Sequence, residues 1–298
     1  MKSNVLLLSL AIGLYACQGG GNKPAQAEEK AADTNTAQEA APEAPATRLS
    51  FAFDTDTVLT TNESVLPTEE TIYVSCINGK PTDQDGNGFI ATINADGQVL
   101  ERKWAEGLDA PKGMGIHAGK LYVTDVDELV AIDLADPTQQ ERFPVKGAVF
   151  LNDVAVADER IYFSDMKTGK LHAFQAGEVR TVKDSLNGIN GLAFSEEEGQ
   201  LHLLTATGLH KMSRAGELTT INEQVTNGDG LVILGDDEYL ASRWKGEIWH
   251  VQGAEATKLY DSKDENIKTA DIGYHAAAKT LFVPRFFANK VTAMRFEP

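Results

Sequence analysis

Six short motifs recur along this chain, and their leading residues carry the side chains best suited to chemistry. Each motif joins a leading, mostly polar residue to a small or acidic residue and then to an aliphatic one. The leading residues are Glu63, Lys112, Asn152, Asn190, Asp229 and Ala270. Carboxylate and side-chain amide oxygens are the ligands that hard cations such as calcium prefer. Four of these residues therefore have the chemistry to hold one divalent metal ion together.

The charges of the motifs favour a cation in the same place. The second residues of the motifs are Ser64, Gly113, Asp153, Gly191, Gly230 and Asp271. Two carboxylates about 6 Å apart repel each other by roughly 3 kcal/mol at an effective dielectric of about 20, and Asp153 and Asp271 add to this repulsion. Lys112 offers one positive charge, whereas a divalent ion also satisfies the amide oxygens. Asn-Asp, Asn-Gly and Asp-Gly are common turn dipeptides as well, but their shared phase in the repeat favours a metal site.

Runs of strand-forming residues predict the elements that position these motifs. The clearest runs are residues 71–75, 120–124, 160–164, 200–204, 238–242 and 280–284, and each begins about eight to ten residues after the start of a motif. Third strands are expected at 129–133, 170–174 and 247–251, and charged fourth strands at 99–104 and 178–183. No long amphipathic helical pattern competes with them. The chain is therefore predicted to be all-β.

The repeat length predicts a six-bladed β-propeller over residues 48–298. The motifs lie about 40 residues apart, with a longer first interval that holds an insertion between residues 77 and 88, and this is the length of a four-stranded blade. The last repeat ends after its third strand, and the strand-like segment 48–59 is expected to join it and close the ring, which removes exposed sheet edges. A solenoid would need capping units at both ends. Because innermost strands begin at one rim of a propeller, we expect the leading residues to form a ring around the channel.

Four of the motifs, in their order along the chain, resemble the successive motifs of a known family. They are Glu63-Ser64-Val65, Asn152-Asp153, Asn190-Gly191-Leu192 and Asp229-Gly230-Leu231. The family is that of the gluconolactonases and senescence-marker proteins (regucalcin-like), which are six-bladed β-propellers related to the paraoxonases and diisopropylfluorophosphatase. The resemblance covers all of residues 48–298.

This resemblance implies an activity and a set of site residues. It implies a calcium-type site made by Glu63, Asn152, Asn190 and Asp229. It also implies that Asp229 acts as general base or nucleophile and that Asp153 contacts a small-molecule substrate. The implied reaction is metal-dependent hydrolysis of a lactone or related ester, in which the ion polarises the carbonyl. A propeller that binds a ligand or a protein without turning it over is the other class that the sequence leaves open.

Two features depart from the family pattern. Lys112 places an ammonium group in the ring, where it can repel the metal, pair with Asp271 or Asp153, or bind an anionic substrate. A metal-free enzyme that uses Lys112 and Asp229 as an acid and base pair is a further alternative. None of the six histidines can be matched to the catalytic histidines of the paraoxonases.

Loops that follow the second strands open on the same rim and are expected to set substrate choice. The residues expected to bind substrate there are Arg243, Trp244, Arg285 and Phe286, and Met166 and Lys167 occupy an equivalent loop. Arginines beside aromatic rings suit a polar or anionic substrate with a flat apolar face. A solvated hairpin with a packed aromatic residue is the alternative.

The N-terminal sequence predicts export and a lipid anchor. Residues 1–16 have the pattern of a lipoprotein signal peptide, in which an apolar run leads to Ala16-Cys17. Cys17 is the expected lipidation site, and residues 17–47 are expected to form a disordered tether because they contain no aromatic residue and little apolar surface. The protein is then exported, lipid-anchored in the bacterial cell envelope, and in contact with the membrane only through its lipid. Tyr15 is bulky for a lipobox, so ordinary secretion is the alternative.

The overall charge and the remaining motifs narrow the partners. The formal net charge of −17 makes nucleic acid an unsuitable partner, because backbone phosphates would be repelled. Cys76 has no partner for an intramolecular disulfide if Cys17 carries lipid, and we expect a monomer. Residues 83–88 match the start of an EF-hand calcium loop, but Asn94 stands where the bidentate glutamate is needed. A glycine-rich hairpin insertion is therefore favoured over a weak calcium site.

Overall fold

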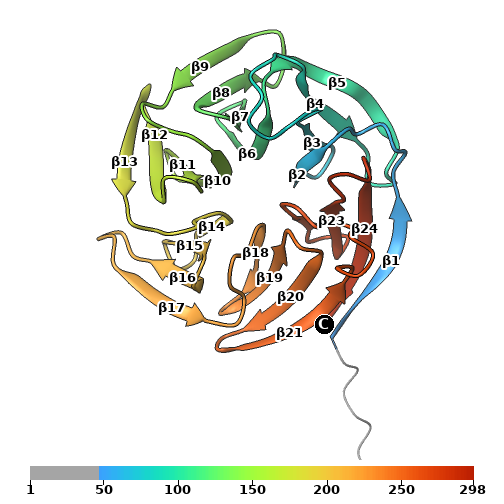
Figure 1. Ribbon diagram of the computed structural model, residues 1–298, viewed down its shortest axis with the longest axis vertical. Helices are drawn as coiled ribbons and strands as arrows, with labels where there is room; N and C mark the ends of the chain where they lie inside the picture. The colour runs from blue at the N-terminus through green and yellow to red at the C-terminus, as the bar shows by residue number, and fades with distance from the viewer. Residues whose placement is uncertain (1–46) are drawn as a thin grey trace, which may run out of the picture. The chain divides into compact units, whose positions relative to one another are not determined.

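Six four-stranded antiparallel sheets are arranged in a ring around a central channel, and together they form a six-bladed β-propeller (Figure 1). This architecture is seen in a computed structural model, which describes residues 47–298. The predicted fold class is therefore confirmed. The signal peptide predicted at 1–16, the lipidation site Cys17 and all but the last residue of the predicted tether lie outside the described residues. Within residues 47–298 there is no helix that is long and apolar enough to cross a membrane.

The blades follow one another along the chain, and each begins with its innermost strand. Blade 1 contains β2 (Asn62–Pro67), β3 (Ile72–Cys76), β4 (Gly88–Ile93) and β5 (Val99–Leu108), and blade 2 contains β6 (Pro111–His117), β7 (Lys120–Asp125), β8 (Glu128–Asp133) and β9 (Gln140–Pro144). Blade 3 contains β10 (Leu151–Ala157), β11 (Arg160–Asp165), β12 (Lys170–Gln175) and β13 (Glu178–Lys183), and blade 4 contains β14 (Leu192–Ser195), β15 (Gln200–Thr205), β16 (Gly208–Met212) and β17 (Leu218–Asn222). Blade 5 contains β18 (Leu231–Gly235), β19 (Glu238–Arg243), β20 (Glu247–Gln252) and β21 (Glu255–Asp261), and blade 6 contains β22 (Gly273–His275), β23 (Thr280–Pro284), β24 (Val291–Glu297) and β1 (Arg48–Asp54).

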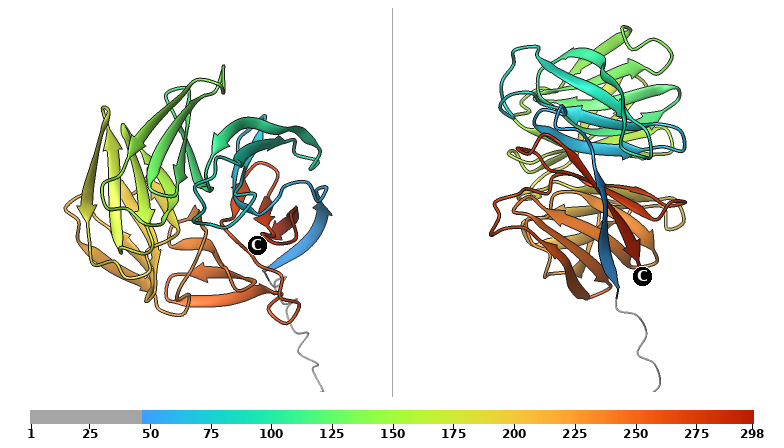
Figure 2. Two further views of the ribbon diagram at one scale, coloured as in Figure 1. Left: turned by 45° about the horizontal axis from the view of Figure 1, so that its top comes forward. Right: turned by 90° about the vertical axis from the view of Figure 1, so that its right-hand side faces the viewer.

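The ring closes through the first strand of the described chain. Strand β1 pairs antiparallel with β24, from Arg48 opposite Glu297 to Asp54 opposite Thr292, and forms the outermost strand of blade 6 (Figures 1 and 2). An ion pair between Lys290 Nζ and Asp54 Oδ2 at 2.5 Å holds one end of this pairing. The predicted closure of the last blade by the N-terminal strand is confirmed.

The apolar core lies between neighbouring blades, which explains the strand composition. One cluster joins Val74 and Phe89 of blade 1 to Phe282 and Ala293 of blade 6. Strand β4, which lies in the middle of its blade, is buried along its whole length, whereas outermost strands such as β13 are largely exposed and carry charged residues. This pattern is the reason that the strand-forming runs and the charged fourth strands could be recognised in the sequence.

Three of the second motif residues are glycines because adjacent blades approach each other closely at the channel. A Cβ added to Gly191 would lie 2.2 Å from the backbone oxygen of Asp229, and one added to Gly230 would lie 2.3 Å from the backbone nitrogen of Ile272. Real side chains cannot occupy this space without moving backbone. Glycine at these two positions therefore lets the start of one blade contact the backbone of the next blade.

Buried serine hydroxyls accept hydrogen bonds from backbone N–H groups of the motifs. The Oγ atoms of Ser75, Ser164 and Ser242 accept hydrogen bonds from the backbone N–H groups of Ser64, Asp153 and Gly230, at 2.9, 3.0 and 2.8 Å. In blades 1 and 3 these contacts coincide with an irregular register between the first two strands. The hydroxyls therefore satisfy backbone groups that the sheet leaves unpaired next to the leading residues.

Candidate functional site

Five of the six leading motif residues line one cavity of about 300 Å³ at the channel. They are Glu63, Lys112, Asn152, Asn190 and Asp229, and they come from blades 1 to 5. The sixth, Ala270, is buried in an apolar cluster with Ile77 and Phe286, two residues that also line the cavity. The structure thus brings together all four residues that were predicted to bind metal.

Each of the four predicted metal ligands presents a buried oxygen without a hydrogen-bond partner among residues 47–298. These atoms are Glu63 Oε2, Asn152 Oδ1, Asn190 Oδ1 and Asp229 Oδ2. A buried acceptor left unsatisfied costs about 1–3 kcal/mol, and such atoms are rare in native proteins. Two carboxylate and two amide oxygens facing one cavity are the donor set that a calcium-type ion takes. The residues present therefore fit a divalent cation.

Asn190 fixes the orientation of Asp229. Its Nδ2 atom donates to Asp229 Oδ1 at 2.6 Å, which leaves Asp229 Oδ2 and Asn190 Oδ1 without a partner. Burial raises the pKa of Asp229 to about 7, and the Asp271 carboxylate adds to this increase, while the hydrogen bond from Asn190 opposes it. The carboxylate is thus oriented and poised to take a proton near neutral pH.

Glu63 lies in the same unfavourable electrostatic environment. Burial raises its pKa well above the ordinary range, and the carboxylates of Asp229 and Asp271 raise it further, while Lys112 lowers it. The cluster as a whole resists carrying its full negative charge. A cation among these side chains would reverse that preference, because it favours the ionised form of each carboxylate.

Lys112 is a buried ammonium group with few partners. Its side chain belongs to a residue only 1% exposed, its Nζ donates to the carbonyl of Ala110 at 2.9 Å, and it lies 4.7 Å from the centroid of the Phe150 ring. Burial lowers its pKa to about 8, opposed by the charges of Glu63 and Asp125. Among residues 47–298 no hydrogen bond or ion pair joins it to Asp153 or Asp271, so the pairing considered from the sequence does not form.

Asp153 lies beside the cavity but does not line it. Its Oδ1 accepts a hydrogen bond from the backbone N–H of Val154 at 2.7 Å, and its Oδ2 accepts one from Leu192 of the next blade at 2.5 Å. Asp271 is placed similarly, since its Oδ2 accepts from Ser64 Oγ at 2.5 Å. Both carboxylates therefore tie adjacent blades together, and Asp153 is not among the residues that line the cavity.

Apolar side chains form the walls of the cavity. These wall residues are Ile77, Pro81, Phe150, Met166, Trp244 and Phe286. Trp244 and Phe286 meet edge to face with their ring centroids 5.9 Å apart. Trp244 is 41% exposed while Phe286 is 3% exposed, so this pair reaches from the interior to the surface of the site.

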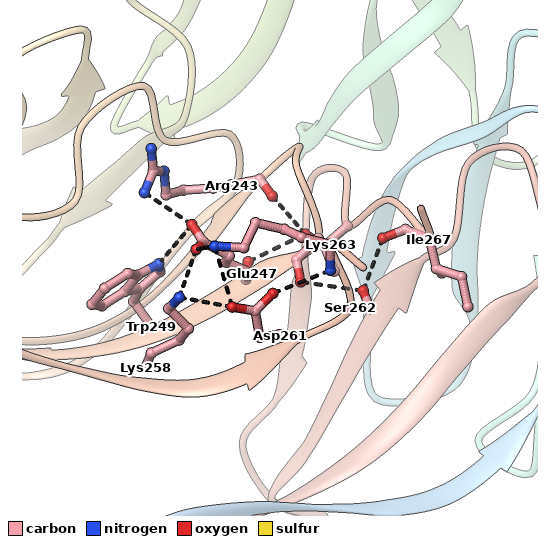
Figure 3. Close-up of polar contacts among 10 residues, drawn as sticks. Arg243, Glu247, Trp249, Lys258, Asp261, Ser262, Lys263 and Ile267 are labelled. Atoms are coloured by element: carbon pink, nitrogen blue, oxygen red, sulfur yellow. Dashed lines mark hydrogen bonds and ion pairs between the residues drawn. The ribbon is translucent and has the colours of Figure 1, made fainter. Parts of the chain in front are cut away.

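The two predicted arginines do not line the cavity. Arg243 Nη1 forms an ion pair with Glu247 Oε2 at 2.9 Å, and the same buried glutamate also binds Lys258 and Lys263 (Figure 3). Arg285 is buried and donates from Nη2 to the hydroxyl of Tyr260. The structure therefore brings the predicted Trp244 and Phe286 to the site and holds the neighbouring arginines on other partners.

Three wall residues, Ile77, Pro81 and Phe150, were not identified as site residues from the sequence. A fourth, Met166, was noted only as part of a loop equivalent to those of the predicted substrate-binding residues. Ile77 and Met166 directly follow the second strands β3 and β11, as Trp244 follows β19. In three of the six blades, the residue that directly follows the second strand therefore lines the cavity. Phe150 precedes β10, and Pro81 lies in the insertion between β3 and β4, so neither shares that position. The EF-hand-like segment 83–88 belongs to the same insertion.

A second group of carboxylates includes none of the residues that line the cavity. Oxygens of Asp109, Asp125 and Glu128 lie within 4.8 Å of one another. Asp125 accepts hydrogen bonds from the backbone N–H groups of Asp109 and Ala110 at 2.8 and 2.6 Å, and Glu128 pairs with Arg142. The Asp109 carboxylate accepts from the backbone N–H of Gly86 at 2.9 Å, so all three acidic side chains have protein partners among the described residues.

Comparisons with known proteins support the fold. No protein-family model matches the chain, and no curated protein sequence matches it. Among solved structures, a gluconolactonase from Xanthomonas campestris is 17% identical with a TM-score of 0.62, over 84% of this chain and 90% of that chain. A catalytically inactive variant of virginiamycin B lyase from Staphylococcus aureus, with quinupristin, is 13% identical with a TM-score of 0.60, over 84% and 99%. A luciferin-regenerating enzyme is 12% identical with a TM-score of 0.61, over 84% and 95%. The expected resemblance to the gluconolactonase type of propeller is confirmed at the level of the fold.

Proposed function

We propose that this protein is a metal-dependent hydrolase of a lactone or related ester. The observation that carries the proposal is the set of four unpartnered buried oxygens from Glu63, Asn152, Asn190 and Asp229 around one cavity. Similarity in fold to a gluconolactonase and to two further proteins named as enzymes is consistent with it.

The four oxygens would hold a divalent cation, with calcium as the best match to an all-oxygen donor set. When bound, this ion supplies the positive charge that polarises a substrate carbonyl. Asn190 contributes in two ways, since its Nδ2 orients Asp229 while its Oδ1 remains available to the ion.

Asp229 is the proposed base. Its Oδ2 takes a proton from water, the water oxygen forms a bond to the acyl carbon, and the bond from that carbon to the ring or ester oxygen breaks. The proton then passes to the departing oxygen, and the product of a lactone is a hydroxy acid. No histidine lines the cavity among the described residues, so a carboxylate is the general base within reach.

The experiment is a hydrolysis assay of the purified protein on gluconolactone and on dihydrocoumarin, before and after removal of divalent metal. We expect turnover that is lost on chelation and restored by calcium. Asp229→Asn keeps the shape of the side chain but removes the base, and should lower kcat by about 10²–10⁴-fold. Asp236→Asn, at an exposed position, is the matched control and should leave kcat unchanged.

The same assay separates the alternatives. Turnover that survives complete removal of metal would favour the acid and base pair of Lys112 and Asp229. Stabilisation of the fold by calcium without any turnover would favour a binding platform.

We further propose that the protein is exported and anchored by lipid at Cys17 in the cell envelope. Its support is the sequence pattern alone, since Cys17 lies outside the described residues. Cys17→Ser should release the protein from the membrane fraction of the producing cell. A variant that stays in the membrane fraction to the same extent as wild type would contradict the anchor.

A further inference from the structure

The walls of the cavity are unsuited to a polyhydroxylated substrate. None of the six wall residues carries a hydroxyl, amide or charged group, and the indole N–H of Trp244 is their sole side-chain donor. Sugar hydroxyls placed against Ile77, Pro81 or Met166 would lose their hydrogen bonds to water without replacement. The walls therefore favour a substrate with an apolar body.

Three aromatic rings give this apolar surface a shape. Phe150 directly precedes β10 of blade 3, Trp244 directly follows β19, and Phe286 lies in the loop after β23. The Trp244 and Phe286 rings are held nearly perpendicular, at 80°. Flat groups stack well against such rings, so an aromatic ring is the body that these walls match best.

Lys112 offers unused hydrogen-bond donors to this cavity. An ammonium group has three N–H donors, and within residues 47–298 one of them is used, on the carbonyl of Ala110. The residue lines the cavity and is almost fully buried. A buried cation with free donors calls for an anionic partner, because burial without one is costly.

Two more lysines lie on the aromatic walls. Lys167 Nζ is 5.8 Å from the ring centroid of Phe150, and Lys268 Nζ is 4.7 Å from that of Trp244. The chain as a whole carries a net charge of −17, so positive groups at these walls contrast with the rest of the surface. Local positive charge raises the concentration of anions near a site.

The net charge of the cavity lining, once a divalent cation is bound, would be neutralised by a substrate with one negative charge. Glu63 and Asp229 carry two negative charges and Lys112 carries one positive charge. With the divalent cation of the proposed function added, the lining has one net positive charge. Asp153 and Asp271 lie behind this lining, with their carboxylates hydrogen-bonded between blades.

We infer that the substrate is a monoanionic lactone or ester with an aromatic-sized apolar body, and that Lys112 binds its anionic group. This inference rests on the proposed function for the reacting carbonyl. The anionic group and the apolar body are separate requirements, and each can be tested without turnover.

The test is isothermal titration of the calcium-loaded protein, at low ionic strength, with benzoate, benzamide and gluconate. Benzoate has both features, benzamide lacks the charge, and gluconate lacks the apolar body. We expect benzoate to bind at least tenfold more tightly than either of the other two. Lys112→Met preserves the length of the side chain and removes its charge, and should abolish the preference for benzoate over benzamide. Lys146→Met, at an exposed lysine, should retain it.

The inference would be overturned if benzoate did not bind, or if benzamide or gluconate bound as tightly as benzoate. It would also be overturned if Lys112→Met still preferred benzoate to benzamide. If Lys112→Met does not fold, the comparison of the three probes on wild-type protein still decides. A calcium titration of the same protein reports the proposed function separately. Calcium binding without discrimination among the probes refutes the substrate class alone, and discrimination without calcium binding refutes the metal site alone.

Discussion

Replacing Asp229 by asparagine should change the stability of the metal-free protein in a direction opposite to most substitutions of buried residues. Burial and the Asp271 charge raise the pKa of Asp229 from its ordinary value of 3.8 to about 7. The folded protein therefore binds a proton more tightly than the unfolded chain between these two pH values, so stability falls as pH rises through this range. A difference of this size corresponds to about 4 kcal/mol.

Asp229→Asn removes this loss because an amide does not ionise, while its oxygen can still accept the hydrogen bond from Asn190. In chelator at pH 8, we expect the variant to be more stable than wild type by up to about 4 kcal/mol. At pH 4, where wild-type Asp229 is protonated in the folded state, the two proteins should be nearly equal. The Asp229 carboxylate also raises the pKa of Glu63, so neutralising Asp229 relieves that repulsion and acts in the same direction, towards a more stable variant at pH 8.

The assay is urea unfolding in chelator at several pH values, with Asp236→Asn as the control. Calcium supplies the second half of the test, since a ligand at about 100 times its Kd adds about 2.7 kcal/mol to stability. Wild type should gain this stability and Asp229→Asn should gain much less. A variant that is less stable than wild type at pH 8 in chelator would refute the electrostatic account of the cavity.

Three further predictions concern the scaffold. Gly191→Ala places a Cβ 2.2 Å from the backbone oxygen of Asp229 and should destabilise the fold by roughly 1–3 kcal/mol, whereas Gly235→Ala, with the nearest atom at 4.0 Å, should cost much less in the same urea titration. Glu247→Gln should destabilise by about 3 kcal/mol. Burial alone would raise the pKa of Glu247, but hydrogen bonds from Lys258 and Lys263 lower it to about 2. Wild type should therefore lose this stability as pH falls below about 4.5, whereas Glu247→Gln should not. Urea unfolding at pH 3 and pH 7 measures the difference. Deletion of residues 48–54 exposes the edge of blade 6 and should cause association, measured by light scattering.

Much of the fold could be predicted because its determinants are local. Strands in a propeller are short and buried on the inside of each blade, so runs such as Lys120–Asp125 and Arg160–Asp165 stand out by composition alone. All six second strands begin within one residue of the predicted positions. The clustering of Glu63, Asn152 and Asp229 was predictable as well, because rotational symmetry brings equivalent positions together.

The direction of individual side chains was not predictable in the same way. Asp153 points between the blades, where its carboxylate accepts a hydrogen bond from the backbone N–H of Leu192. The direction of Arg243 is set by its ion pair with Glu247, and that of Arg285 by its hydrogen bond to the hydroxyl of Tyr260. These partners come from other strands, and the repeat pattern contains no information about them.

The residues of the cavity wall could be predicted only in part. Trp244 was expected at the site, while Phe150 and Pro81 were not, because they lie outside the repeated positions. An insertion such as the one that holds Pro81 has no counterpart in other blades. Its contribution to the cavity appears only when the chain is folded.

The most direct test of the central claim is a crystal structure grown with calcium, with the ion located by its anomalous scattering. The account predicts one peak in the cavity, at about 2.3–2.6 Å from oxygens of Glu63, Asn152, Asn190 and Asp229. A map without a peak there, or with the ion bound instead by Asp109, Asp125 and Glu128, would contradict it.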